Sequence, residues 1–196
     1  LVQDAINAAD SAIDFSKYTL VENVAEDAPL IFLGRLERVK GCHTAIKIAL
    51  ETGNRLIIAG NISLLKDEQL YFENEIKPFI DGSTIQYVGP VDDEQKNYYL
   101  GQAKALLFPI EWNEPFGMVM VEAMSCGTPV IAFNKGSVNE IIYNNINGFI
   151  CLDYTQMIEG IQNLIQINRK NCRSFSYDHF HSLIIVMKYL NILSAT

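Results

Sequence analysis

Residues 114–132 of the 196-residue chain read EPFGMVMVEAMSCGTPVIA. The segment combines a polar loop, an apolar run of helical length, a tight turn and an apolar strand pattern. Pro115 suits the first position of a helix, where its missing N–H leaves no hydrogen bond unmade, so we expect a helix over 115–126. The apolar run that follows predicts a strand over 129–133. A helix that is apolar on every side is normally buried.

Two carboxylates, Glu114 and Glu122, bracket this apolar stretch with seven residues between them. A buried carboxylate is unfavourable unless another group donates hydrogen bonds to it. Glu122 therefore needs a partner, and a hydroxyl group of a ligand is one candidate. The alternative interpretation places Glu122 at a surface position of the helix.

The expected start of the helix presents free backbone N–H groups at the positive end of the helix dipole, from Phe116, Gly117, Met118 and Val119. Gly117 has no side chain that would keep a ligand away from this backbone. Such a terminus favours a phosphate group. A phosphate site flanked by two carboxylates that accept bonds from hydroxyl groups indicates a nucleotide sugar.

The Glu-x7-Glu pair and its PFG and EAMSCGTPVIA neighbours resemble the donor-binding motif of the family 4 retaining glycosyltransferases of GT-B fold, the glycosyl transferases group 1. The resemblance runs over residues 29–189, most of the chain. It implies the C-terminal, donor-binding domain of such an enzyme and not the whole enzyme. Because the chain begins at Leu1 and not at a methionine, we expect a fragment, a processed chain or a trimmed chain.

A loop with the sequence GRLERVKG, residues 34–41, follows the first predicted strand. Its cations Arg35 and Lys40 can neutralise a diphosphate at the carboxyl end of a sheet, whereas the plain alternative is a solvated basic loop. The resemblance implies that Arg35 and Lys40 contact the donor diphosphate. Arg38 lies between them but does not match the motif.

The resemblance also implies roles for the remaining site residues. Glu122 would bond the ribose hydroxyls, and Glu114 would act as the catalytic residue that orients the sugar through its hydroxyls. Backbone groups of Val88 and Gly89 would bond the base. A glycosidase acid–base pair is a different interpretation, but eight helical steps would separate the two backbone positions by ~12 Å. The carboxyl groups of glycosidases lie only ~5–9.5 Å apart.

Strand and helix patterns alternate along the chain, with predicted strands at 29–33, 55–59, 84–88, 105–109, 129–133 and 149–151. Strands separated by helices imply right-handed crossovers and a parallel sheet. We therefore predict an α/β fold, a Rossmann-like three-layer α/β/α domain with a parallel sheet of about six strands. By the resemblance this domain is one half of a GT-B fold. Ligands of such sheets bind at the carboxyl ends of the strands.

Helices are predicted at 42–52, 67–79 and 92–101, and from 154 onward with a break near 168–174. Asp92 is expected to cap its helix, with two acids in the first turn; the alternative is a metal site at Asp92-Asp93-Glu94. The series from Ser137 to Glu140 predicts a capping box. We expect no metal and no cofactor, since the nucleotide sugar is a substrate.

The pattern of polar, apolar and alternating strand and helix signals divides the chain into three expected segments. Residues 1–28 are polar and acidic and are expected to connect domains, and 29–175 form the nucleotide-sugar domain. Residues 176–196 form a closing helix that would pack on the missing N-terminal domain. Without that domain its apolar side chains would be exposed and invite self-association, unless they pack on this domain's own sheet. Those side chains are Leu183, Ile184, Ile185, Val186, Met187, Leu190 and Leu193.

The formal net charge of −8 argues against a nucleic-acid partner, because phosphate backbones require clustered Lys and Arg. The four cysteines show no Cys-x-x-Cys pair, which favours a reduced, cytosolic setting, although two disulfides are possible in principle. With no visible signal peptide, we expect a cytoplasmic protein, either free or peripheral at a membrane. The three histidines are expected to be structural or exposed.

The function that follows is the donor half of a transferase that moves a hexose-type unit from a nucleoside diphosphate to an acceptor hydroxyl. The acceptor can be a polysaccharide, a glycolipid or a small molecule. Alone, the chain is expected to bind donor weakly and to transfer little. Two alternatives stay open: an epimerase of the same fold, and a non-catalytic nucleotide-sugar-binding module or one half of a split transferase.

Overall fold

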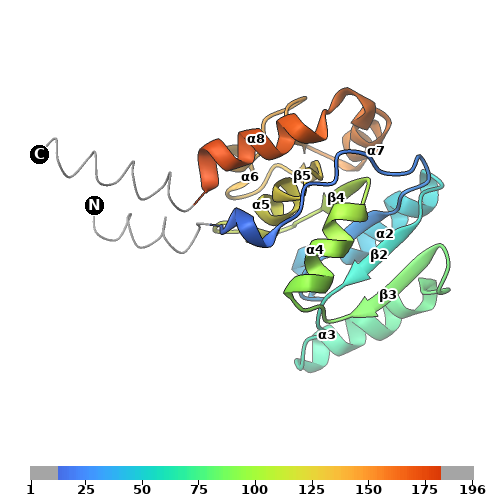
Figure 1. The fold of residues 1–196 in the computed structure, drawn as a ribbon. Coiled ribbons are helices and arrows are strands. Elements are labelled where there is room, and N and C mark those ends of the chain that lie inside the picture. Colours follow the sequence, from blue (N-terminus) through green and yellow to red (C-terminus); the bar gives the residue numbers. More distant parts are fainter. Residues whose placement is uncertain (1–12, 182–196) are drawn as a thin grey trace, which may run out of the picture.

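The computed structural model describes residues 13–181, and residues 1–12 and 182–196 lie outside the described part (Figure 1). Six strands form one sheet in the order β3-β2-β1-β4-β5-β6, and every pairing is parallel. The order reverses between β1 and β4, as in doubly wound dinucleotide-binding folds. The strands are β1 Leu30–Leu33, β2 Leu56–Ala59, β3 Ile85–Gly89, β4 Ala105–Phe108, β5 Val130–Phe133 and β6 Gly148–Cys151.

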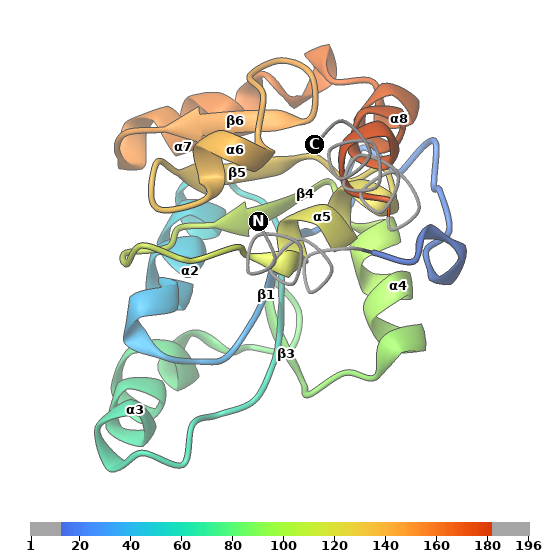
Figure 2. The same ribbon diagram turned by 90° about the vertical axis from the view of Figure 1, so that its left-hand side faces the viewer.

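Helices cover both faces of the sheet, so the predicted three-layer α/β/α fold is confirmed (Figure 2). One face carries α2 (Cys42–Glu51), α3 (Lys66–Tyr71) and α7 (Tyr154–Gln162). The other carries α4 (Asp93–Gln102), α5 (Met118–Ser125), α6 (Val138–Ile141) and α8 (Arg169–Phe180). Each face has its own core of buried apolar side chains, because central parallel strands expose apolar residues on both sides.

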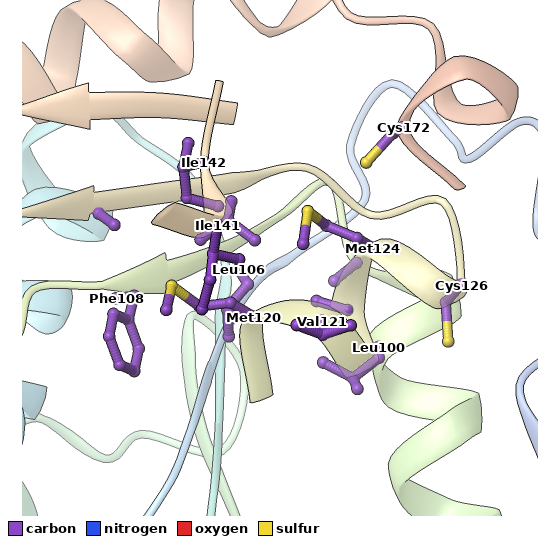
Figure 3. Packing of buried hydrophobic residues seen from close by; sticks show 14 of the residues in the cluster. Leu100, Leu106, Phe108, Met120, Val121, Met124, Cys126, Ile141, Ile142 and Cys172 are labelled. Atoms are coloured by element: carbon purple, nitrogen blue, oxygen red, sulfur yellow. The ribbon is translucent and has the colours of Figure 1, made fainter. Parts of the chain in front are cut away.

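Helix α5 lies at the centre of the second core, as its apolar sequence predicts. Figure 3 shows Met120, Val121 and Met124 of α5 beside Leu106 of β4 and Leu100 of α4, and all five are fully buried. Truncating such a side chain to alanine typically lowers the free energy of unfolding by about 2–5 kcal/mol. This packing fixes the axis of α5 and therefore where its N-terminus points.

The segment before β1 packs against the second face and is held there by α8. The Arg173 guanidinium donates to the carbonyl oxygens of Phe15 (3.3 Å) and Tyr18 (2.8 Å). The amide of Ile13 donates to the carbonyl of Phe180 at 3.2 Å, so the two ends of the described part lie side by side. The predicted boundary at 175/176 falls inside α8, and the division into three segments stays a prediction. The predicted roles of 1–12 and 182–196 lie outside the described residues.

Helix α5 begins at Met118, so the predicted start at Pro115 is wrong. Gly117 has φ 70°, a left-handed conformation that an α-helix cannot include, and it caps the helix instead. Because residues 114–117 are not helical, the separation of ~12 Å between the two carboxylates, derived from a continuous helix, no longer applies.

Two other local predictions fail and two are confirmed. Ser137 makes no capping bond to α6, because its hydroxyl donates to the Phe116 carbonyl at 2.7 Å. The predicted break near 168–174 lies earlier, since α8 begins at Arg169 with Asn168 as its cap. Asp92 does cap α4, in a capping box with Gln95. Residues 67–79 are helical throughout, with a π-helical turn over Phe72–Ile76.

Candidate functional site

A cavity of about 180 Å³ opens where the strand order reverses, between the carboxyl ends of β1 and β4. Ligands of doubly wound sheets bind at this switch point. Of the ten predicted site residues, the structure brings six together here. The lining is Phe32, Leu33, Gly34, Arg35, Lys40, Phe108, Glu114, Gly117, Met118 and Val119.

The carboxylate of Glu114 is held by two donors that converge on one of its oxygens. Lys40 forms an ion pair and hydrogen bond with Oε2, and the side chains of Lys40 and Glu114 are only 14% and 16% exposed. The Trp112 indole N–H donates to the same oxygen at 3.0 Å, and the Lys40 ammonium lies 5.1 Å from the Trp112 ring centroid. Oε1 has no partner among the described residues, so it is available to a ligand hydroxyl.

The backbone of Glu114 is fixed by the loop that follows β5. The amide of Ser137 donates to the Glu114 carbonyl at 3.0 Å, and the Ser137 hydroxyl donates to the Phe116 carbonyl. Gly136, at φ 56°, lies against the same backbone. The loop after β5 thus sets the path of the chain between Glu114 and α5.

Arg35 is the more exposed of the two cations that line the cavity. Its guanidinium pairs with Glu37 at 2.9 Å, and its side chain is 65% exposed. The Glu37 side chain is only 15% exposed, but the solvated guanidinium keeps the contribution of the pair to about 1 kcal/mol, so a phosphate group can replace Glu37 at little cost. Arg38 instead pairs with Glu75 and lies over the Tyr71 ring, away from the cavity.

The first turn of α5 also lines the cavity, beside Arg35 and Glu114. The amides of Met118 and Val119 have no backbone partner in residues 13–181, and they stand at the positive end of the helix dipole. Gly117 has a φ of 70°, which residues with a Cβ rarely adopt, and a Cβ there would also lie 2.7 Å from Met120 Cε and 3.3 Å from Phe108 Cζ, so this turn favours glycine. Cations and amide donors therefore face the cavity together with the Glu114 carboxylate.

Four predicted site residues do not line this cavity. Phe116 packs its ring against the second core, and Val88 and Gly89 end β3, two strands away from β1 across the sheet. Glu122 lies about one turn into α5, and its side chain is 14% exposed. Its Oε1 accepts hydrogen bonds from the Tyr18 hydroxyl (2.9 Å) and the Lys96 ammonium (2.7 Å).

The Glu122 cluster shifts the pKa values of both its partners. Burial, then the charge of Glu122, raises the pKa of the Tyr18 hydroxyl. Burial acts to lower the pKa of Lys96, but the hydrogen bond and charge of Glu122 outweigh it, and the pKa is raised. Lys96 is therefore a cation at neutral pH and Tyr18 a neutral donor.

The remaining cavities and residue clusters of the described part offer no comparable site. A larger cavity, about 1000 Å³, lies at the amino ends of the strands beside Asn54, Lys104 and Pro129, far from the switch point. No group of three or more His, Cys, Asp or Glu within residues 13–181 could hold a metal ion. The four cysteines are free and buried. None of the helices over 13–181 has the length and hydropathy needed to cross a bilayer.

Residues 21–179 match the family described as glycosyl transferases group 1. Glycogen synthase of Mycobacterium tuberculosis is 31% identical over 129 residues, which cover 63% of this chain and 30% of that protein. The structure of AviGT4, a glycosyltransferase involved in avilamycin A biosynthesis, is 25% identical with a TM-score of 0.76, covering 92% of this chain and 55% of that one.

Anabaena HepE in complex with UDP is 20% identical with a TM-score of 0.79, and covers 94% of this chain and 56% of HepE. At this identity the likeness concerns the fold alone. In each of these cases the chain spans about a third to just over half of the relative's length, and in fold it corresponds to the C-terminal half of GT-B structures.

Sequence reasoning missed three residues that hold the carboxylates. Trp112 stands two positions before Glu114 and carried no recognised signal, although an indole beside a carboxylate is a possible donor. Tyr18 and Lys96 stand 104 and 26 positions before Glu122, so no local pattern relates them to it.

Proposed function

Because the chain belongs to the family of glycosyl transferases group 1, we propose that it forms the donor-binding half of a retaining glycosyltransferase. The reaction moves a hexose-type sugar from a nucleoside diphosphate to an acceptor hydroxyl. The observation that carries this proposal is the switch-point cavity, in which Arg35, Lys40, the first turn of α5 and Glu114 converge.

In this proposal the cavity binds the diphosphate. Negative charge grows on the diphosphate as the bond to the sugar breaks, and fixed positive groups stabilise that charge in the transition state. Arg35 and Lys40 supply cations, and the amides of Gly117, Met118 and Val119 supply donors at the helix terminus. No metal is required for this stabilisation.

Glu114 is proposed as the catalytic residue that orients the sugar. Its Oε2 is bound by Lys40 and Trp112, and its free Oε1 accepts a sugar hydroxyl. Holding the sugar in one orientation supplies proximity to the acceptor. Phe116 supports this turn through its carbonyl bond to Ser137.

The nucleoside is proposed to extend from the diphosphate toward α4 and the end of β3. Glu122 binds the ribose hydroxyls, and backbone groups of Val88 and Gly89 bind the base. HepE has been solved with UDP and with UDP-glucose, which makes a uridine donor the first to test here. The acceptor class and the contribution of an N-terminal domain stay open, and we expect little transfer by this chain alone.

Calorimetry of the chain with UDP, GDP and ADP, each with and without its sugar, tests the proposal. We expect one diphosphate to bind preferentially, and Arg35→Ala to weaken its binding about ten- to hundredfold, because a charge-assisted hydrogen bond contributes about 1.5–3 kcal/mol. Arg55→Ala is the matched control: Arg55 is also exposed and paired, to Asp27, at the amino end of β2. Equal affinity in both variants, or no binding of any diphosphate, would contradict the proposal.

A further inference from the structure

Glu122 is held in place by two side chains from different elements. Tyr18, from the segment before β1, and Lys96, from α4, both donate to Oε1. The Lys96 side chain is 18% exposed, and its ammonium also lies 3.3 Å from Asp93 and 5.9 Å from the Tyr18 ring centroid. Oε2 of Glu122 has no partner among the described residues and is not fully buried.

The backbone around Tyr18 is fixed from both sides. The amide of Thr19 donates to Asn97 Oδ1 on α4 at 2.8 Å, and the Tyr18 carbonyl accepts from Arg173 on α8 at 2.8 Å. The Tyr18 hydroxyl therefore reaches Glu122 from an anchored backbone and not from a loosely held segment. This anchoring lowers the entropy lost when the hydroxyl bonds to Glu122.

The two carboxylates of the Glu-x7-Glu pair are held by the same arrangement of donors. In Glu114 a lysine and an indole N–H occupy one oxygen, and in Glu122 a lysine and a phenol occupy one oxygen. In each case the second oxygen is left for another donor. A carboxylate bonded twice at one oxygen cannot rotate freely, so the direction of its free lone pairs is set.

We propose that Tyr18 and Lys96 are positioning residues that orient Glu122 toward the ribose hydroxyls of the donor. The proposal rests on the donor-site function above and adds two residues to it. Removing either donor leaves Glu122 more freedom of orientation. The ribose bond then becomes weaker, whereas the diphosphate, which is bound elsewhere, keeps its affinity.

The test is the preference for a ribonucleoside diphosphate over its 2′,3′-dideoxy analogue, measured calorimetrically with the base that the chain prefers. We expect the chain to prefer the ribonucleotide by about tenfold, and Tyr18→Phe and Lys96→Met to reduce this preference by at least about threefold. Binding of the dideoxy analogue should stay the same. Lys96→Arg, which keeps the charge, should retain most of the preference.

Tyr98→Phe and Lys47→Met are matched controls, because both side chains are exposed and lie on α4 and α2. A merely structural role of Tyr18 and Lys96 would weaken both ligands alike and leave the preference intact, which would overturn the proposal. Glu122→Gln distinguishes failure of the ribose assignment from failure of the positioning role. If Glu122→Gln keeps the preference, the ribose assignment fails; if it loses the preference while Tyr18→Phe and Lys96→Met keep it, only the positioning role fails.

Discussion

A Cβ atom on Gly136 would lie 2.3 Å from the carbonyl oxygen of Glu114 and 2.6 Å from its amide nitrogen. No side chain fits at that distance, and the φ of 56° also disfavours any residue with a Cβ. The loop after β5 and the proposed catalytic residue are therefore in backbone contact, although 22 positions separate them in the sequence (136 − 114).

Gly136→Ala should displace the backbone of Glu114. We expect a loss of about 2–4 kcal/mol in the free energy of unfolding, from strain and overpacking together. Affinity for the nucleotide sugar should fall with it. Gly53→Ala is the control, since Gly53 has a similar φ of 66° with no atom within 4 Å of its Cβ position, and it should lose only about 1 kcal/mol. Equal losses in the free energy of unfolding for Gly136→Ala and Gly53→Ala, measured with urea, would show that the contact with Glu114 is unimportant.

Trp112→Phe should affect the sugar and not the diphosphate. The change removes the indole N–H that donates to Glu114 Oε2 at 3.0 Å but keeps an aromatic ring beside Lys40. Loss of one hydrogen bond to a charged group, about 1.5–3 kcal/mol, predicts a fall of at least about tenfold in affinity for the nucleotide sugar. The free diphosphate should bind as before, and calorimetry measures both. A parallel loss for the two ligands would assign Trp112 to the diphosphate instead.

Arg169 is the one charged side chain that is buried among residues 13–181, and its replacement should lower stability strongly. It is 8% exposed, and its guanidinium donates to the carbonyls of Val21, Gly101 and Ala103 and to the Thr128 hydroxyl. Arg169→Met leaves these acceptors buried without a donor, which predicts a loss of about 3–5 kcal/mol in urea unfolding.

The neighbouring Lys170→Met is the control for Arg169→Met. Lys170 pairs with Glu22 in an exposed ion pair, so its loss should change the free energy of unfolding by at most about 1 kcal/mol. A small effect of Arg169→Met would mean that water reaches the freed carbonyls.

His43 should make stability depend on pH. Its ring lies between the Tyr71 hydroxyl (2.9 Å from Nδ1) and Glu111 (3.3 Å from Nε2). Burial lowers the pKa of His43 below the ordinary value of 6.5; Glu111 partly offsets this, and Arg38 and Lys47 add to it. Because the unfolded chain binds this proton at a higher pH than the folded chain does, the free energy of unfolding falls as the pH drops below 6.5.

His43→Asn should reduce the slope of unfolding free energy against pH between pH 5 and 7, by at most about 1.4 kcal/mol per pH unit. Denaturant unfolding at several pH values measures the slope. His179→Asn, which replaces an exposed histidine, should leave the slope closer to that of the parent chain. An unchanged slope in His43→Asn would show that His43 takes up its proton without unfolding.

The fold followed from local patterns because strand and helix signals repeat along the chain. All six predicted strands begin and end within one residue of the observed ones. The Asp92 cap was readable because a capping box is a relation between residues three apart. The order of strands was not readable, since many sheet orders satisfy the same alternation of elements.

The sequence by itself determined the α/β class, the parallel sheet and the loops that carry Arg35, Lys40 and Glu114 at its carboxyl edge. Their convergence in one cavity depended on β1 and β4 becoming neighbours, which only the tertiary structure decided. The start of α5, the contact of Gly136 with Glu114 and the donors to Glu122 were decided in the same way. These features depend on side chains and loops that meet across long separations, and periodicity and capping report only on near neighbours in the chain.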